Sequence, residues 1–196
     1  MPIYKLSYFP IKGIAEVSRQ LFVLAGQPFE DNQIPFDATP FGQAPLLEVD
    51  GKPIPQSFAI ARYLASQFGF AGRTTFEAAW VDALADQWKD YFIEMKPFLG
   101  VANGFLKTGD VDQLRKDVGE PVRDKHFALL EKAAQNGANG HFVGSSLTWV
   151  DLLVVDHIVV FEQHVPGFFD GFPSIKKIRK FVQSDPRLRE YLEKRP

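Results

Sequence analysis

The sequence of 196 residues contains no cysteine. Disulfide bonds, thiolate metal ligands and a cysteine nucleophile are therefore excluded, and any thiol chemistry must use a thiol that a substrate brings. An excess of one charge is also lacking, because 24 acidic and 22 basic side chains leave a formal net charge of -2. This balance gives no reason to expect nucleic acid or an anionic membrane surface as a partner.

Long apolar runs are missing as well. No segment approaches the roughly 18 consecutive apolar residues of a membrane-spanning helix. The first residues, Met1 to Lys5, lack the apolar stretch of a signal peptide, so we expect a cytoplasmic protein that has no membrane partner. What the chain does have is 45% hydrophobic and 14% aromatic residues, which is enough for a sizeable core in one domain or two.

The first 70 residues mix strand and helix patterns. Apolar residues recur at helical spacing from Ile14 to Leu24, and Gly26 is a plausible stop. Asp50-Gly51 readily adopts the positive φ of a tight hairpin turn. The expected elements are a strand over 3–8, a helix over 13–25, a weaker strand over 29–34, a hairpin of strands 46–49 and 52–54, and a helix over 56–68. This order is a thioredoxin-like α/β arrangement.

After a short linker at about residues 70–74, the rest of the chain reads as helical. Thr148 followed three residues later by Asp151 resembles a capping box, with Asp in place of the usual Glu or Gln. The nearly continuous apolar run from Leu152 to Phe161 predicts a helix that is buried on most sides. Further helices are expected from about residue 75, over 111–136, over 173–183 and over 185–194.

Taken in order, these segments resemble the cytosolic glutathione transferases, and most of all the sigma class of invertebrate type, which is related to the glutathione-dependent prostaglandin D synthases. The resemblance extends over essentially the whole chain. It implies the glutathione transferase fold, with a glutathione-binding thioredoxin-like α/β domain over 1–72 and an all-α helical domain over 75–196 that contributes the electrophile or ligand pocket. The motifs are Tyr4-Lys5-Leu6-Ser7-Tyr8-Phe9 with Gly13, the stretch from Pro40 to Gly51, the stretch from Gln56 to Leu64, and Leu147 to Asp151.

Tyr8 is the candidate catalytic residue. A tyrosine at the end of a strand most often packs in the core with a satisfied hydroxyl, but the resemblance implies that Tyr8 donates its hydroxyl proton to the sulfur of glutathione. A free thiol with a pKa of about 8.5 is only about 3% thiolate at neutral pH, and lowering that pKa by about two units requires about 2.7 kcal/mol. A hydrogen bond to a charged acceptor contributes about 1.5–3 kcal/mol, so one positioned phenol can supply most of it.

Gln56-Ser57 opens the helix that closes the first half. Ser at a helix start is by itself an ordinary N-cap. The free amides and the positive end of the helix dipole also suit a carboxylate, and the resemblance implies that both residues hold the γ-glutamyl carboxylate of glutathione.

Pro45 is by itself a turn or edge-strand proline. The resemblance implies a cis Ala44-Pro45 bond and pairing of the Ala44 backbone with the cysteinyl backbone of glutathione. It also implies that Gly42 and Gln43 line the same edge.

Asp90 shares a helical face with Asp82 and Asp86, which is ordinarily a solvated face. The resemblance implies a homodimer in which Asp90 faces the γ-glutamyl ammonium in the partner's site. Lys89 interrupts the acidic cluster and the four histidines show no metal-ligand spacing, so no metal is expected.

An apolar pocket for the second substrate is expected beside the sulfur, with Phe9, Ile11, Ile14 and Phe92 as its walls. The chain departs from the family pattern twice. Ile14 stands where an arginine often follows the glycine, and the segment from Ile34 to Pro40 lacks the usual tryptophan and lysine. Either this loop is shortened and glutathione binds more weakly, or a stretch is missing from the chain.

The expected function is conjugation of the thiolate of reduced glutathione to small hydrophobic electrophiles, as in detoxification. Glutathione is then a co-substrate, and no tightly bound cofactor is expected. Three alternatives stay open: a carrier of apolar ligands such as haem or fatty acids, a glutathione-dependent prostaglandin isomerase, and a structural descendant without catalysis. The sequence does not disclose the electrophile.

Overall fold

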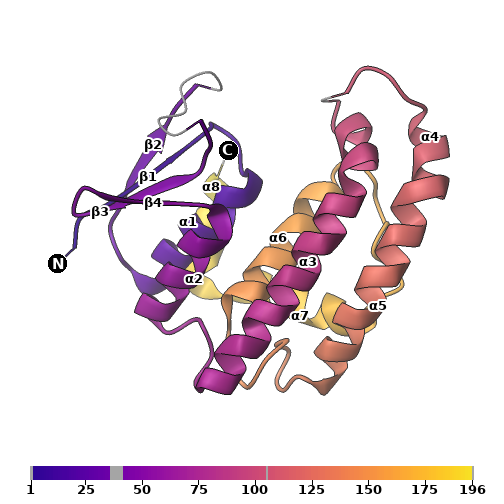
Figure 1. Ribbon diagram of the computed structural model, residues 1–196. Coiled ribbons are helices and arrows are strands. Elements are labelled where there is room, and N and C mark those ends of the chain that lie inside the picture. Colours follow the sequence, from indigo (N-terminus) through magenta and orange to yellow (C-terminus); the bar gives the residue numbers. More distant parts are fainter. Residues whose placement is uncertain (1, 36–41, 105, 196) are drawn as a thin grey trace. The chain divides into compact units, whose positions relative to one another are not determined.

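Figure 1 shows the computed structural model, which describes residues 2–35, 42–104 and 106–195. The chain folds into two compact units, Met1–Ala71 with Val182–Pro196, and Gly72–Phe181. The first is a thioredoxin-like α/β unit and the second is helical, which confirms the predicted fold class. Most of the Ile34 to Pro40 segment, at which the sequence departs from the family pattern, lies outside the described residues.

The first unit is built on a mixed four-stranded sheet in the order β2-β1-β3-β4. Strand β1 pairs parallel to β2 and antiparallel to β3, which forms a hairpin with β4. Asp50 and Gly51 have φ values of 51° and 77°, so the hairpin turn has the predicted positive φ at both residues. The strands are β1 (Tyr4–Tyr8), β2 (Glu30–Gln33), β3 (Leu46–Val49) and β4 (Lys52–Pro55).

Three α-helices and one short 3₁₀ turn complete this unit: η1 (Gly13–Ala15), α1 (Glu16–Ala25), α2 (Ser57–Phe68) and α8 (Pro186–Lys194). Helices α1 and α2 lie side by side against the sheet (Figure 1) and fill the core between them with side chains such as Leu21 and Leu64. Helix α1 ends at Gly26, whose φ of 60° fits the left-handed cap that glycine favours.

Helix α8 belongs with the first unit although it closes the sequence. The sequence analysis grouped residues 182–196 with the helical half. In the structure α8 lies against α1, and the Arg187 guanidinium donates to the Leu24 carbonyl at 3.3 Å. The periodicity of the sequence does not predict this contact, because α1 and α8 lie near opposite ends of the chain.

The second unit contains the long helix α3 (Thr75–Ala102), which packs against both α5 (Glu120–Asn136) and α6 (Trp149–Phe161). The α4 turn (Val111–Leu114) and the π-helical turn η2 (Arg115–Gly119) run directly into α5. Together they give the helix predicted over 111–136. Helix α7 (Pro173–Ser184) follows. Among the described helices, none has the length and apolarity needed to cross a membrane.

Helix α6 is the buried centre of the second unit, as predicted. Its capping box is complete: the Thr148 side chain accepts from the backbone of Asp151, and the Asp151 carboxylate accepts from the Thr148 N–H at 2.8 Å. The same carboxylate accepts from the Phe142 N–H at 2.8 Å, so this buried charge is satisfied by hydrogen bonds.

Candidate active site

Tyr8 ends β1 with its ring buried (6% exposed), 5.0 Å from the Phe9 ring. Burial raises the pKa of Tyr8, while a hydrogen bond from the Ile14 N–H and the charge of Arg19 act in the opposite direction. Because the net change of the pKa is upward, the phenol keeps its proton at neutral pH. The Ile14 amide occupies an acceptor position of the hydroxyl, so the hydroxyl proton is directed elsewhere and is available to an acceptor.

Gly13 makes this arrangement possible. Its φ is +48°, and a Cβ at this position would lie 2.5 Å from the Tyr8 Oη. No side chain fits there, so the backbone of the η1 turn can approach the phenol closely enough for the Ile14 amide to bond it.

The register of the sheet aligns Tyr8, Pro45 and Gln56 across one end of three neighbouring strands, and we call this row of strand ends the sheet edge. Ser7 faces Leu46, and Leu46 faces Pro55, so the next position along these three strands aligns Tyr8, Pro45 and Gln56. Neighbouring strands lie about 4.8 Å apart, which puts roughly 10 Å between the outer two. An extended tripeptide spans about 10 Å, so this edge has the reach of glutathione.

Gln56 has an unusual backbone, with φ 75° and ψ 115°, and it is the N-cap residue of α2. Such a conformation in a residue other than glycine costs about 1–3 kcal/mol and is concentrated at functional sites. The Gln56 side chain does not cap the helix. Its Nε2 donates instead to the Gln43 Oε1 at 2.9 Å, which ties together two of the predicted glutathione contacts.

Ser57 is the first residue of α2 and not its N-cap, so the N-cap interpretation of Ser57 is wrong. With no side-chain cap from Gln56, the positive end of the α2 dipole is not neutralised by that residue. Gly42, Gln43 and Ala44 lead into this edge, and the Ala44-Pro45 bond is cis.

The residues predicted to line an apolar pocket fall in both units. Phe9, Ile11 and Ile14 follow Tyr8 directly, so three of them are on one segment of the first unit. Phe92 belongs to the second unit and stacks on Trp88, with ring centroids 5.1 Å apart. The pocket that would join them stays a prediction.

Asp90 is exposed on α3, as is Asp86 one turn earlier. Within residues 2–35, 42–104 and 106–195, no group of three or more His, Asp or Glu side chains is arranged to hold a metal ion.

His157 on α6 is half-buried and has a hydrogen-bond partner. Its Nε2 lies 2.9 Å from the Tyr91 hydroxyl, and burial lowers the pKa of the ring to about 3.

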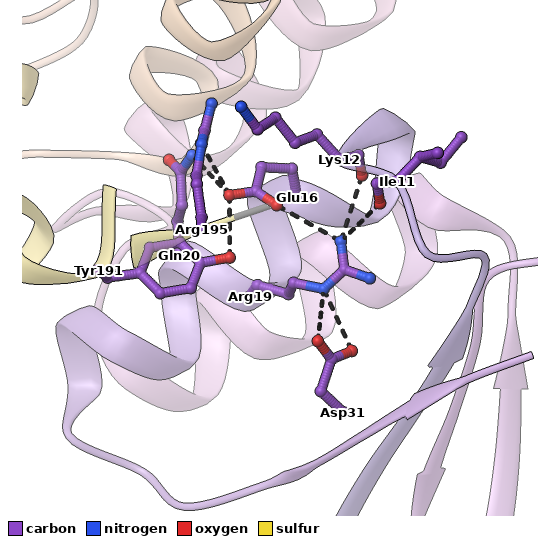
Figure 2. Close-up of polar contacts among 8 residues, drawn as sticks. All are labelled: Ile11, Lys12, Glu16, Arg19, Gln20, Asp31, Tyr191 and Arg195. Atoms are coloured by element: carbon purple, nitrogen blue, oxygen red, sulfur yellow. Dashed lines mark hydrogen bonds and ion pairs between the residues drawn. The ribbon is translucent and has the colours of Figure 1, made fainter. Parts of the chain in front are cut away.

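Sequence reasoning missed a buried polar cluster close to Tyr8. Glu16, Arg19 and Gln20 on α1 are buried, and they lie beside the half-buried Tyr191 and Arg195 of the C-terminal segment (Figure 2). The spacing of Glu16 and Arg19 is compatible with an ion pair, but that pattern is usually found on a solvated helix face.

Two family models match the chain. They are the glutathione S-transferase N-terminal domain, over residues 6–66, and the glutathione S-transferase C-terminal domain, over residues 101–195. The chain belongs to the glutathione S-transferase family.

Its relatives include the probable glutathione S-transferase 6 of Caenorhabditis elegans, which is 47% identical over 98% of this chain and 97% of that protein. Na-GST-3 of the hookworm Necator americanus, described as monomeric, is 46% identical, with a TM-score of 0.94 over 99% of this chain and 98% of that one. A Nu-class glutathione S-transferase from Haemonchus contortus is 45% identical, with a TM-score of 0.90 over 100% of this chain and 98% of that one. Prostaglandin synthase D of Nilaparvata lugens is more distant: 28% identity and a TM-score of 0.85 over 99% and 98% of the two chains.

Proposed function

We propose that this protein conjugates the thiolate of reduced glutathione to small hydrophobic electrophiles, with Tyr8 as the catalytic residue. The observation that carries the proposal is the Tyr8 hydroxyl: it keeps its proton, accepts from the Ile14 N–H, and lies on the strand whose edge aligns with Pro45 and Gln56. A neutral phenol at this position can donate to a sulfur anion and stabilise it.

In this proposal the tripeptide lies along the sheet edge. Gln56 and Ser57 hold the γ-glutamyl carboxylate at the start of α2, where the helix dipole favours an anion. The Ala44 backbone pairs with the cysteinyl backbone beside Pro45. Gly42 and Gln43 border the same edge, and the sulfur then lies near Tyr8.

The two substrates are bound by different parts of the chain. Residues 1–72 bind glutathione, and residues 75–181 contribute the wall against which the electrophile is held, because residues 182–196 belong with the first unit. Phe9, Ile11 and Ile14 would border the sulfur from the glutathione side, and Phe92 from the helical side. Tyr8 stabilises the sulfur as an anion before the reaction. The sulfur lone pair then forms the new carbon–sulfur bond, and the electron pair of the broken bond leaves with the displaced group, a halide ion when the electrophile is an aryl halide.

Further parts of the proposal concern assembly and context. We place Asp90 in the partner's site of a sigma-like homodimer, opposite the γ-glutamyl ammonium, with no tightly bound cofactor and a cytoplasmic role in detoxification. The exposure of Asp90 is compatible with this contact. The monomeric description of Na-GST-3 makes the oligomeric state a necessary measurement.

The test is the ultraviolet thiolate absorbance of bound glutathione as a function of pH, in the native protein and in Tyr8→Phe. Loss of one hydrogen bond to the sulfur, worth about 1.5–3 kcal/mol, should raise the pKa of the bound thiol by about one to two units. Conjugation of a generic aryl halide near neutral pH should fall by about 3- to 25-fold, as the thiolate fraction of bound glutathione falls from about three-quarters to between about a quarter and about 3%.

The matched control is Tyr4→Phe, which removes a phenolic hydroxyl from the same face of the same strand, about 13 Å from Tyr8 along β1. It should change neither the titration nor the rate. If Tyr8→Phe also leaves both unchanged, the proposed role of Tyr8 is wrong.

A second candidate function is glutathione-dependent isomerisation of a prostaglandin, which the likeness to prostaglandin synthase D favours. Turnover of a prostaglandin endoperoxide that leaves the glutathione concentration constant would identify it. The predicted carrier role differs from both reactions: it requires stoichiometric binding of an apolar ligand with little turnover and does not depend on the Tyr8 hydroxyl.

A further inference from the structure

A buried carboxylate, Glu16, joins α1 to the C-terminal segment (Figure 2). Its Oε1 accepts from the Tyr191 hydroxyl at 2.9 Å and from the Arg195 guanidinium at 2.7 Å. Its Oε2 lies 3.4 Å from Nη1 of Arg19. A carboxylate that is 1% exposed needs such partners, because a buried unpaired charge is strongly destabilising.

Arg19 is the centre of the cluster. It is 5% exposed, and its Nε lies 3.1 Å and 3.0 Å from the two carboxylate oxygens of Asp31 on β2. A planar guanidinium held between two carboxylates from different elements has little freedom to rotate.

The remaining contacts of Arg19 reach the loop after Tyr8. Its Nη1 donates to the carbonyl oxygens of Ile11 at 3.1 Å and Lys12 at 3.2 Å. These carbonyls immediately precede Gly13 and Ile14, and the Ile14 N–H donates to the Tyr8 hydroxyl. The guanidinium carbon also lies 5.8 Å from the centroid of the Tyr8 ring.

We propose that Arg19 is a positioning residue for Tyr8, and that Glu16 together with Arg195 and Tyr191 holds Arg19 in place. The C-terminal segment thereby sets how well the phenol stabilises the sulfur of glutathione. This inference rests on the proposed function, in which the Tyr8 hydroxyl bonds that sulfur.

The physical reason is geometric and electrostatic together. Arg19 holds the Ile11 and Lys12 carbonyls, and through them the start of the turn that carries the Ile14 amide. A hydrogen bond weakens steeply when its angle departs from linear, so a shift of this turn weakens the bond to the phenol. Its positive charge also stabilises negative charge shared between the phenol and a bound sulfur. If Glu16 loses Arg195, its remaining partners are Tyr191, Gln20 and Arg19, and Arg19 is the only cation among them. The buried carboxylate then attracts the Arg19 guanidinium more strongly and draws it away from the Ile11 and Lys12 carbonyls.

The test compares Arg195→Gln, Arg195→Lys and Tyr191→Phe with Arg189→Gln. Arg189 is an exposed arginine on α8, the helix that carries Tyr191 and ends just before Arg195, and it donates to the Ser184 carbonyl. Each variant is titrated for the thiolate absorbance of bound glutathione, and its pH–rate profile and its glutathione dissociation constant are measured. Denaturant unfolding is recorded for each so that rates are compared for folded protein.

Arg195→Gln should raise the pKa of the bound thiol by about half a unit to one unit and lower the rate below that pKa by about 3- to 10-fold. The glutathione dissociation constant should change less than twofold, since none of these side chains is proposed to touch the tripeptide. Arg195→Lys should restore part of the shift, Tyr191→Phe should show a smaller shift, and Arg189→Gln none.

The double variant Tyr8→Phe/Arg195→Gln separates this inference from the proposed function. If Arg195 acts through Tyr8, its substitution has no further effect once the hydroxyl is absent. If Tyr8→Phe alone leaves the titration unchanged, the proposed function fails. If Tyr8→Phe shifts the titration while folded Arg195→Gln and Tyr191→Phe do not, the cluster only stabilises the fold and this inference is overturned. If Arg195→Gln does not fold, the titration of Tyr191→Phe alone decides between the two outcomes.

Discussion

Replacement of Gly13 by alanine tests the link between the backbone conformation at Gly13 and the Tyr8 hydroxyl, for which we propose a catalytic role. The substitution adds one methyl group, and the structure gives two separate costs for it. The residue must hold a φ of +48°, and its Cβ would stand 2.5 Å from the Tyr8 Oη and 2.9 Å from its Cε1. The left-handed conformation costs a non-glycine residue about 1–2 kcal/mol. The overlap with the phenol adds about 1–3 kcal/mol, as overpacking does in a dense core.

Gly26→Ala isolates the first cost. Gly26 has a φ of +60°, caps the C-terminus of α1, the helix that follows η1, and has no atom within 4 Å of the position of an added Cβ. We expect Gly26→Ala to lose about 1–2 kcal/mol of unfolding free energy with an unchanged rate, and Gly13→Ala to lose about 2–5 kcal/mol. The assays are denaturant unfolding and, on the folded fraction, the titration of bound glutathione.

Gly13→Ala should also affect function, because the added methyl group overlaps the ring of Tyr8. The ring of Tyr8 must move away from the new methyl group, which stretches or breaks the bond from the Ile14 amide. The bound thiol should then titrate at least about one pH unit higher, as for loss of most of one hydrogen bond. In a Tyr8→Phe background the closest contact is gone, so the stability difference between Gly13→Ala and its parent should shrink. Equal losses in Gly13→Ala and Gly26→Ala, with normal thiol titration, would refute the reasoning.

Three further predictions concern the helical unit. Burial lowers the pKa of His157 to about 3, so the folded state favours the neutral ring; the resulting stability is present above the unfolded pKa of about 6.5 and is lost as pH falls toward 3. The unfolding free energy should therefore drop by about 2 kcal/mol between neutral pH and about pH 5. The variant His157→Gln should remove this pH dependence, and His164→Gln, at an exposed histidine, should keep it. Asp151→Asn should lose about 2–4 kcal/mol in denaturant unfolding, because the amide nitrogen cannot accept from the backbone donors that the carboxylate satisfies. Asp90→Asn should raise the KM for glutathione by about 2- to 10-fold with kcat unchanged, as expected for a partly exposed ion pair, whereas Asp86→Asn should not; equal KM values would count against the partner-site role.

Much of the fold could be predicted because its signals are local. The Asp50-Gly51 turn, the Gly26 helix stop and the capping box of Thr148 and Asp151 each depend on residues a few positions apart, and all three have the expected geometry. Tyr8 itself was identified from a motif at the end of a strand. Its role stays a prediction, while its surroundings now give that role a physical basis.

The rest of the site could not be predicted, because it depends on contacts distant in sequence. A helical pattern divides α1 into an apolar and a polar side, but it does not tell that α8, more than a hundred residues later, covers Glu16 and Arg19. The backbone of Gln56 was equally hidden, since residues other than glycine rarely adopt its φ of 75° and no residue type encodes it.

Tyr8 could act on glutathione either as a phenolate that removes the thiol proton or as a neutral phenol that donates a hydrogen bond to the sulfur. The sequence does not distinguish these two roles, and the direction of the pKa change of Tyr8 favours the second. A tyrosine that removed the thiol proton would need its phenolate at neutral pH, and hence a pKa well below 10. Burial moves the pKa of Tyr8 upward, and neither the Ile14 amide nor Arg19 reverses that change. In the proposed reaction the phenol is therefore a hydrogen-bond donor: the proton of glutathione would leave by another route, to bulk water or to a group of the tripeptide itself, and the hydroxyl would lower the energy of the anion that remains. On the inference drawn above, the cluster around Arg19 would affect the reaction through the angle of this hydrogen bond and through the positive charge that Arg19 holds beside the phenol.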